Sequence, residues 1–276
     1  MNDFFSSKAR ANQVFRRQLG RIRDAGGECF AFGGFPRSVY MSGGEANPKD
    51  VDLVFDRSSF DAFLSESKPY IKKRNRFGGA NLLIEGVDID AWCIEDTWAF
   101  NEGYFSGQIG FSTLPRTTYL SFDAIAVELW PKKGASRRIY SAGFFETFDR
   151  KSIDLNFDPN PFPELTVVRT LVAAKRFSLM LSATLARATA KLMLECGSRQ
   201  IYQAQLDHYK TEYFSLDQLG GILVQLVRHL NERCGLPYKP FSARVERQLH
   251  LVDELACTNS SLPAEEKLGV QLKLFS

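Results

Sequence analysis

Residues 50–55 (DVDLVF) place two aspartates at the start of a short run of apolar residues. In a β-strand the side chains alternate between the two faces, so Asp50 and Asp52 point to one face and Val51 and Leu53 to the other. The two carboxylates then lie about 7 Å apart along the backbone. Hard divalent cations prefer oxygen ligands, and Mg²⁺ is often held by one or two carboxylates together with substrate phosphates. The pattern predicts a site for Mg²⁺ or Mn²⁺.

A glycine turn precedes this strand. Residues 29–32 (CFAF) predict a short buried strand, and Gly33, Gly34 and Arg37 follow it directly. Glycine lets backbone N–H groups approach phosphate oxygens closely, and the planar guanidinium of Arg37 could clamp a triphosphate. Each part is common by itself. In the order strand, GG-x-x-R, loop and D-x-D strand, the parts predict a nucleotide-binding site.

The predicted secondary structure changes near residue 163. Before it, helices are predicted at 8–25 and at 58–67, the latter capped by Ser58 or Ser59, and apolar runs suit strands at 70–76, 81–95, 122–130 and 138–148. After it, apolar residues follow helical spacing over 164–196, 199–209, 215–233 and 241–257. We therefore predict an α/β domain over residues 1–162 and a helical domain over 163–276.

Histidine and cysteine usage excludes several chemistries. The three histidines of this 276-residue chain (His208, His229 and His250) lie in its last third, so the first 200 residues cannot form a Ser-His-Asp triad or a histidine-ligated zinc site. The five cysteines include no C-x-x-C pair, which favours reduced thiols in a cytoplasmic protein. No signal peptide is recognised, and no apolar run reaches the roughly 18 residues of a membrane span.

Residues 32–55 resemble the head domain of the CCA-adding tRNA nucleotidyltransferase and bacterial poly(A) polymerase family, within the polymerase β superfamily. That family carries a GG-x-x-R-D turn and a D-x-D strand separated by a loop of this size. Residues 118–126 (TYLSFDAIA) are similar to its R-D-x-T-x-N-A segment, and residues 164–177 to its E-D-x-x-R helix. The resemblance covers roughly residues 28–180. It implies an α+β fold: a polymerase β-like head, with a mixed sheet and helices, followed by an all-α region.

The resemblance also implies a third carboxylate on a neighbouring strand. Residues 87–92 (VDIDAW) offer Asp88 and Asp90 on one strand face. We prefer Asp90, because the family pattern has apolar residues on both sides of the aspartate, and Asp88 is the alternative. The implied catalytic and metal-binding set is therefore Asp50, Asp52 and Asp90, with two Mg²⁺ ions.

The chain departs from the family pattern at several specificity positions. Ser38 stands where the family has Asp after the arginine, residues 118–119 replace its Arg-Asp pair, and Asp123 replaces its asparagine. Arg169 matches the helix arginine that reads the incoming base in the family, but Leu165 occupies the position of the partner Asp, and the spacing to the preceding glutamate is one residue too long. The pattern predicts a retained catalytic centre with altered specificity.

These features predict a nucleotidyltransferase that moves a nucleoside monophosphate from an NTP to an acceptor hydroxyl and releases pyrophosphate. RNA, such as the 3′ end of tRNA, is the preferred acceptor. A protein or a small molecule is the alternative acceptor, because polymerase β-type heads act on all three classes. The alternative is a non-catalytic regulator that binds nucleotide or RNA. A toxin or defence protein is a third possibility. The sequence leaves the nucleotide and the oligomeric state open.

Overall fold

The computed structural model describes residues 20–21, 23–24, 27–43, 50–84, 86–131 and 135–241. The chain divides into two compact units, Met1–Phe145 and Glu146–Ser276. The predicted domain border between residues 162 and 163 stays a prediction. The helices predicted at 8–25 and 241–257 fall almost wholly outside the described residues, as does most of the loop between Met41 and Asp50.

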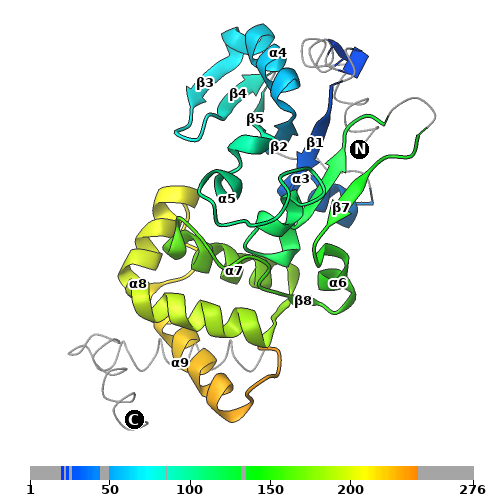
Figure 1. Ribbon diagram of the computed structural model, residues 1–276. Coiled ribbons are helices and arrows are strands. Elements are labelled where there is room, and N and C mark those ends of the chain that lie inside the picture. Colours follow the sequence, from blue (N-terminus) through cyan, green and yellow to red (C-terminus); the bar gives the residue numbers. More distant parts are fainter. Residues whose placement is uncertain are drawn as a thin grey trace. The chain divides into compact units, whose positions relative to one another are not determined.

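Within the described residues, the first unit contains a seven-stranded sheet in the order β3-β4-β5-β2-β1-β6-β7 (Figure 1). The strands are β1 (Cys29–Phe32), β2 (Asp50–Phe55), β3 (Ile71–Arg74), β4 (Ala80–Ile84), β5 (Val87–Cys93), β6 (Ile125–Glu128) and β7 (Ile139–Ser141). The helices of this part are α3 (Gly34–Met41), α4 (Arg57–Ser67), α5 (Trp98–Asn101) and, at the border of the two units, α6 (Phe144–Asp149). β2 and β5 are parallel, and the other neighbouring pairs are antiparallel. This mixed sheet with helices confirms the predicted α+β class.

The strand predicted at 81–95 is two strands. β4 and β5 form an antiparallel hairpin in which Ile84 pairs with Val87. The chain reverses at Gly86, whose φ of 82° suits glycine far better than other residues. Sequence reasoning missed this turn because Glu-Gly is not among the dipeptides that signal a tight hairpin most strongly, such as Asn-Gly and Asp-Gly. The consequence is that β5 lies beside β2.

The two faces of the central strands are covered by different segments. On one face, Leu53 and Phe55 are completely buried, and the ring of Phe55 stacks on that of Phe63 of α4 at 4.9 Å. On the other face, Phe30 of β1 stacks on Phe111 at 4.3 Å. That second face also carries the aspartates of β2, because β-strand side chains alternate.

Helix α4 is capped by Asp56, and the prediction that Ser58 or Ser59 caps it is wrong. The Asp56 carboxylate accepts hydrogen bonds from the backbone N–H of Ser59 (2.9 Å) and of Glu28 (2.7 Å). The hydroxyls of both serines donate to the same carboxylate. Aspartate caps helices as well as serine does, so the two residue types could not be separated by propensity. The contact with Glu28 decides in favour of Asp56.

We expect Asp56→Ala to lower the free energy of unfolding by about 1–2 kcal/mol near neutral pH, as loss of an N-cap does. Burial alone would raise the pKa of Asp56, but the hydrogen bonds from Ser59, Glu28 and Ser58 outweigh it and lower the pKa. Because this folded-state pKa lies below the unfolded one, the stabilisation is present above about pH 4 and is lost at lower pH. Urea unfolding at pH 7 and pH 3 measures this. Asp61→Ala, on the exposed face of the same helix, is the control, and a deficit that persists at pH 3 contradicts the carboxylate's role.

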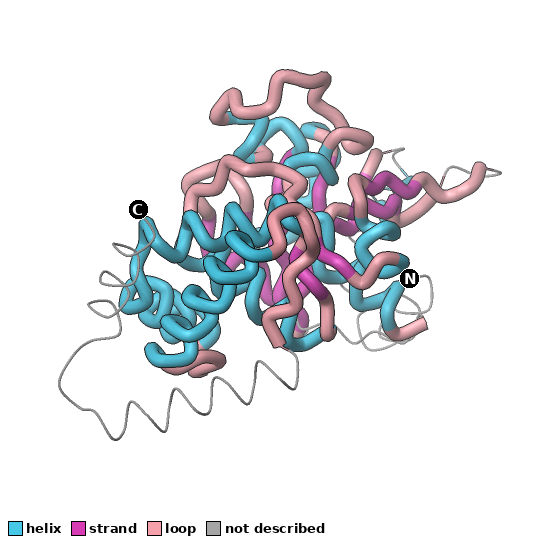
Figure 2. The backbone as a smooth tube through the Cα atoms, turned by 90° about the horizontal axis from the view of Figure 1, so that it is seen from below, coloured by secondary structure: helices cyan, strands magenta, loops and turns pink. Residues whose placement is uncertain are grey.

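The second unit is mainly helical. Its long helices are α7 (Pro163–Phe177), α8 (Ala183–Tyr209) and α9 (Leu216–Glu232), and helices are drawn in cyan in Figure 2. α8 packs against both α7 and α9. A short parallel ladder joins β8 (Ser152–Ile153) to β9 (Met180–Leu181). α8 bends at Gly197, which lies between the predicted helical segments 164–196 and 199–209 and has a φ of 74°. None of the described helices is both long and apolar enough to cross a membrane.

The buried side chain of Gln205 forms hydrogen bonds with the backbone of the segment that connects α8 to α9. Gln205 is completely buried. Its Oε1 accepts hydrogen bonds from the backbone N–H groups of Tyr213 (3.0 Å) and Phe214 (3.1 Å), and its Nε2 donates to the carbonyl oxygen of Phe214 (2.6 Å). The amide therefore satisfies three backbone groups at the point where the chain turns into α9.

We expect Gln205→Leu to lower the free energy of unfolding by about 2 kcal/mol, because buried backbone groups left without partners cost about 1–3 kcal/mol. Gln203→Leu is the matched control. Gln203 lies on the exposed side of the same helix, where a substitution changes stability by about 0.5 kcal/mol or less. Chemical unfolding of both variants gives the two values, and equal losses would remove the special role of Gln205.

Candidate functional site

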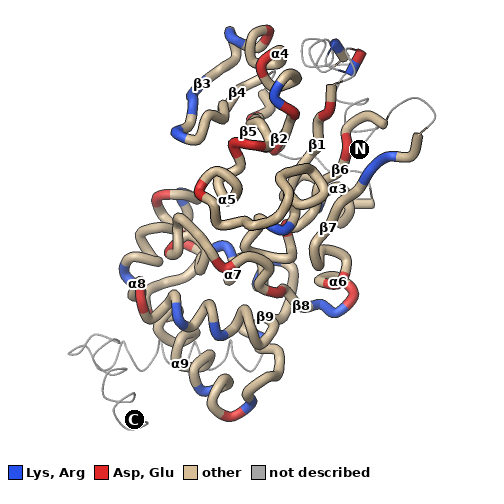
Figure 3. Tube along the Cα trace, viewed as in Figure 1, with Lys and Arg blue, Asp and Glu red and all other residues tan. Residues whose placement is uncertain are grey.

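Four aspartates lie on one face of the parallel strands β2 and β5. In the register of this pair, Asp50 lies opposite Asp88 and Asp52 lies opposite Asp90. Neighbouring strands are about 4.8 Å apart, and residues in register project to the same face. Figure 3 shows the acidic residues at these strands in red. The structure thus brings the three predicted aspartates together and adds Asp88 to them.

Asp88 and Asp90 differ in their partners. The Nζ of Lys72 lies 2.6 Å from a carboxylate oxygen of Asp88, and this ion pair is about half exposed on both sides (44% and 48%). Asp90 accepts a hydrogen bond from the Nδ2 of Asn81 at 3.0 Å. A lysine therefore balances the charge of Asp88, whereas Asp90 lies beside a neutral amide and opposite Asp52. This arrangement favours Asp90 as the third carboxylate of the candidate site.

The glycine turn lies directly beside Asp52. Gly33 has a φ of 61°, a conformation that other residues adopt only with strain. A Cβ at Gly33 would lie 3.9 Å from Oδ2 of Asp52 and 3.9 Å from the backbone oxygen of Asp123. The N–H of Gly33 donates to the carbonyl oxygen of Ile125 at 3.0 Å. A backbone contact to a phosphate would therefore come from Gly34 and the N-terminus of α3, where N–H groups point out of the helix.

Arg37, in the second turn of α3, is held by the segment that precedes β6. Its guanidinium forms an ion pair with Asp123, and its central carbon lies 4.3 Å from the centroid of the Phe122 ring. A Cβ at Gly34 would lie 3.6 Å from Nη2 of Arg37, so the guanidinium lies against the glycine turn. Sequence reasoning noted Asp123 only as a replacement for an asparagine. An aspartate in place of the neutral asparagine adds a negative charge, and this charge was the signal that could have indicated a basic partner such as Arg37.

Arg169 lies in α7, in the second unit, and its side chain is exposed. Burial, followed by the positive charges of Arg169 and Lys210, lowers the pKa of His208. This locates Arg169 near a neighbouring helix of its own unit. Its predicted contact with the nucleotide stays a prediction.

The donor atoms at this site suit a hard divalent cation. Carboxylate oxygens from two adjacent strands are the ligand type that Mg²⁺ takes, with substrate phosphates completing the set. Across the part of the chain that the structure describes, no three His, Cys, Asp or Glu side chains form a ready metal-binding group. The chemistry of the donors therefore fits the ion, and the phosphates of a bound nucleotide would have to supply the remaining ligands.

Cys93 is close to Asp90 in sequence but belongs to the opposite face of β5. It is completely buried, and burial, followed by its hydrogen bond to Glu95, raises the pKa of the thiol to about 12. A thiol protonated at neutral pH is a poor nucleophile. Cys93 is therefore a structural residue, as the strand alternation predicts. The cysteines within the described ranges (Cys29, Cys93, Cys196 and Cys234) are all free thiols.

No protein-family profile and no curated protein matches the chain by sequence. Its fold, by contrast, matches solved structures. An apo form of a CCA-adding enzyme is similar with a TM-score of 0.53 and 16% identity, over 80% of this chain and 50% of that one. The Thermotoga maritima CCA-adding enzyme complexed with tRNA gives a TM-score of 0.52 and 13% identity, over 86% and 64%. A tRNA nucleotidyltransferase complexed with a primer tRNA and an incoming ATP analog gives 0.52 and 14%, over 78% and 70%.

The chain thus spans between 50% and 70% of the length of these three structures. Identities of 13–16% establish a shared fold and leave the activity to be tested. The predicted resemblance is confirmed at the level of the fold: this chain shares its fold with solved CCA-adding enzymes and with a tRNA nucleotidyltransferase.

Proposed function

We propose that this chain is a nucleotidyltransferase, which moves a nucleoside monophosphate from an NTP to an acceptor hydroxyl and releases pyrophosphate. The observation that carries the proposal is the acidic face of β2 and β5. There Asp52 lies opposite Asp90 in strand register, and the glycine turn lies beside Asp52, with 3.9 Å between its Oδ2 and the position of a Gly33 Cβ. Carboxylates next to a glycine turn suit a metal-bound triphosphate better than a bare anion, which they would repel.

In this proposal Asp50, Asp52 and Asp90 hold Mg²⁺ or Mn²⁺. When bound, such ions supply charge neutralisation at the triphosphate and activate the attacking hydroxyl. The chain itself supplies position: the N-terminus of α3 at Gly34 approaches phosphate oxygens, and Arg37 pairs with the terminal phosphates. Holding the α-phosphate in line with the acceptor hydroxyl and neutralising its charge together account for most of the rate gain in transfers of this kind.

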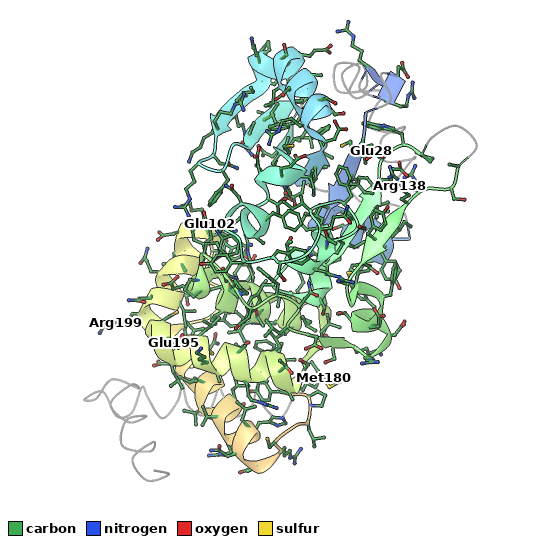
Figure 4. All side chains as sticks on the ribbon, viewed as in Figure 1. Glu28, Glu102, Arg138, Met180, Glu195 and Arg199 are labelled. Carbon is green, nitrogen blue, oxygen red and sulfur yellow. The ribbon has the colours of Figure 1, made fainter. Side chains whose placement is uncertain are left out.

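We propose RNA as the acceptor and an RNA 3′ end as the reacting group. Two of the similar structures contain tRNA, and one of these also contains an ATP analog. In the first unit, exposed basic side chains lie on edge strand β3 and directly after it: Lys72, Lys73, Arg74 and Arg76. In the second unit, further exposed basic side chains lie on α7 and α8: Lys175, Arg176, Arg187, Lys191 and Arg199, the last of which points outward in Figure 4. Exposed lysines and arginines of this kind contact nucleic-acid phosphates. Cytoplasmic localisation stays a prediction.

The test is transfer of label from each α-labelled NTP to total tRNA, with Mg²⁺ or Mn²⁺. The Asp50→Asn/Asp52→Asn double variant is the negative control, and Asp61→Asn, an exposed aspartate on α4, controls for loss of charge. Label on RNA that disappears only in the double variant supports the proposal. Label on protein moves the acceptor to a protein hydroxyl. Nucleotide binding without any pyrophosphate release, across RNA, protein and small-molecule acceptors, favours the regulator.

A further inference from the structure

We propose that Asp123 and Phe122 are positioning residues that hold Arg37 in place for the terminal phosphates of the nucleotide. This inference rests on the proposed function, because it assigns a nucleotide to the glycine turn. It concerns a residue at which the chain departs from the family pattern, where an aspartate replaces an asparagine. Asp123 therefore acts through Arg37 and need not touch the substrate.

Two contacts hold the guanidinium: its Nη1 pairs with Oδ1 of Asp123, and its central carbon lies 4.3 Å from the ring centre of Phe122. The guanidinium also lies beside the glycine turn, since a Cβ added at Gly34 would be 3.6 Å from Nη2. Asp123 and Phe122 belong to a short turn, Ser121–Asp123, which directly precedes β6. Because β6 pairs with β1, this turn is placed beside the glycine turn that follows β1. The pairing of β1 with β6 therefore brings Asp123 and Phe122 next to Arg37.

The geometry leaves the guanidinium able to bind an anion. Arginine has five N–H donors in a rigid plane, so it can pair with a carboxylate through one part of that plane and with a phosphate through another. Here Nη1 pairs with Asp123, and Nη2 lies on the side of the glycine turn. The neighbouring Ser38 hydroxyl donates to the carbonyl oxygen of Gly34 at 2.9 Å, which keeps the start of α3 in the same place.

Fixing Arg37 in advance favours binding. A free arginine side chain loses about 2 kcal/mol of rotamer entropy when it is immobilised, and here much of that loss occurs on folding. The pair is partly shielded from water, since Arg37 is 18% exposed and Asp123 is 35% exposed. Asparagine at position 123 would keep the shape but lose the charge, and charge-assisted hydrogen bonds are roughly twice as strong as neutral ones.

The experiment is a double-mutant cycle on nucleotide binding. Calorimetry with Mg²⁺ measures the Kd of ATP, of AMP and of inorganic tripolyphosphate, which carries no base. We expect Asp123→Asn to raise the Kd of ATP and of tripolyphosphate about tenfold and that of AMP by less than about twofold, because AMP lacks the terminal phosphates. In an Arg37→Gln background, Asp123→Asn should change the Kd of ATP by less than about twofold. Phe122→Leu should give a smaller loss in the same direction. Thermal unfolding of each variant checks that it is folded.

Other outcomes of the same experiment would contradict the proposed role of Asp123. Unchanged or tighter ATP binding by Asp123→Asn would mean that Asp123 restrains Arg37 and competes with the phosphates. An equal loss in the Arg37→Gln background would mean that Asp123 acts on the nucleotide independently, and an equal loss for AMP would point to a structural role. If Asp123→Asn weakens ATP binding only when Arg37 is present, but the wild type transfers no label, the proposed function alone is overturned. If the wild type transfers label but Asp123→Asn has no effect that depends on Arg37, this inference alone is overturned. No binding of any probe by the wild type would overturn both.

Discussion

Asp90→Asn is expected to lower the kcat of nucleotide transfer by more than about 10³-fold, and Asp88→Asn by less than about threefold. The two substitutions form a matched pair. Each removes one negative charge from the same face of β5, two positions apart, and each replaces a carboxylate by an amide of the same shape. A factor of 10³ corresponds to about 4 kcal/mol of activation free energy.

The expected difference follows from the partners of the two side chains. Asp90 lies opposite Asp52 across the parallel pair, so a cation held by both aspartates loses a ligand when Asp90 becomes an amide. Asp88 already pairs with Lys72 at 2.6 Å, in an exposed ion pair. Such pairs contribute about 0–1 kcal/mol to stability, so their loss leaves both the fold and the site in place.

Single-turnover transfer at saturating NTP and metal separates the two variants, with urea unfolding as the check on folding. Equal losses would mean that the total negative charge of this face matters and the position of the ligand does not. A large loss for Asp88→Asn alone would exchange the roles of the two aspartates. A lower apparent metal affinity in Asp90→Asn, and not in Asp88→Asn, is expected in the same experiment.

The parts of the site that the sequence predicts are those encoded by local patterns. The two-residue period of a strand is sufficient to put Asp50 and Asp52 on one face, and the glycine turn before α3 has a recognisable spacing. The pairing of Arg37 with Asp123 is different, since 86 residues separate the two. It arises because β1 lies between β2 and β6, and no local pattern specifies that order of strands. The cap at Asp56 was missed for a related reason, because its contact with Glu28 decided between residues of similar propensity. The hairpin at Gly86 was missed because its Glu-Gly turn is a weak local signal.

Long-range order also creates a partly buried ion pair that no sequence pattern reveals. The Glu128 side chain on β6 is only 5% exposed. The Nη2 of Arg138 donates to it at 2.6 Å and to Glu28 at 2.7 Å, and Glu28 and Arg138 lie next to each other in Figure 4. The guanidinium also lies 5.1 Å from the ring centre of Phe30. Arg138 thus joins the start of β1 to β6 at the end of the sheet.

Arg138→Met is expected to lower the free energy of unfolding by about 2–3 kcal/mol at pH 7, because the mostly buried Glu128 carboxylate keeps only the backbone N–H of residue 138 as a donor. The loss is smaller than for a fully buried pair, because the Arg138 side chain is 36% exposed and solvent screens its charge. Burial alone would raise the pKa of Glu128, and hydrogen bonds from Arg138 outweigh it and lower that pKa. Because this folded-state pKa lies below the unfolded one, the stabilisation that the Arg138 side chain supplies is present above about pH 4 and is lost at lower pH. The deficit of the variant should therefore shrink as the pH falls towards 4, where the Glu128 carboxyl takes up a proton.

The double variant Glu128→Leu/Arg138→Met decides whether the ion pair or only the unpaired charge matters. Replacing a buried ion pair by apolar residues is often neutral or stabilising, so we expect the double variant to unfold within about 1 kcal/mol of the wild type, well above Arg138→Met alone. Arg116→Met, on an exposed side chain, controls for the loss of an arginine. Urea unfolding at pH 7 and pH 4 gives all the values. If the double variant is as unstable as Arg138→Met, the bridge from β1 to β6 itself stabilises this end of the sheet, and the unpaired carboxylate is not the cause of the loss.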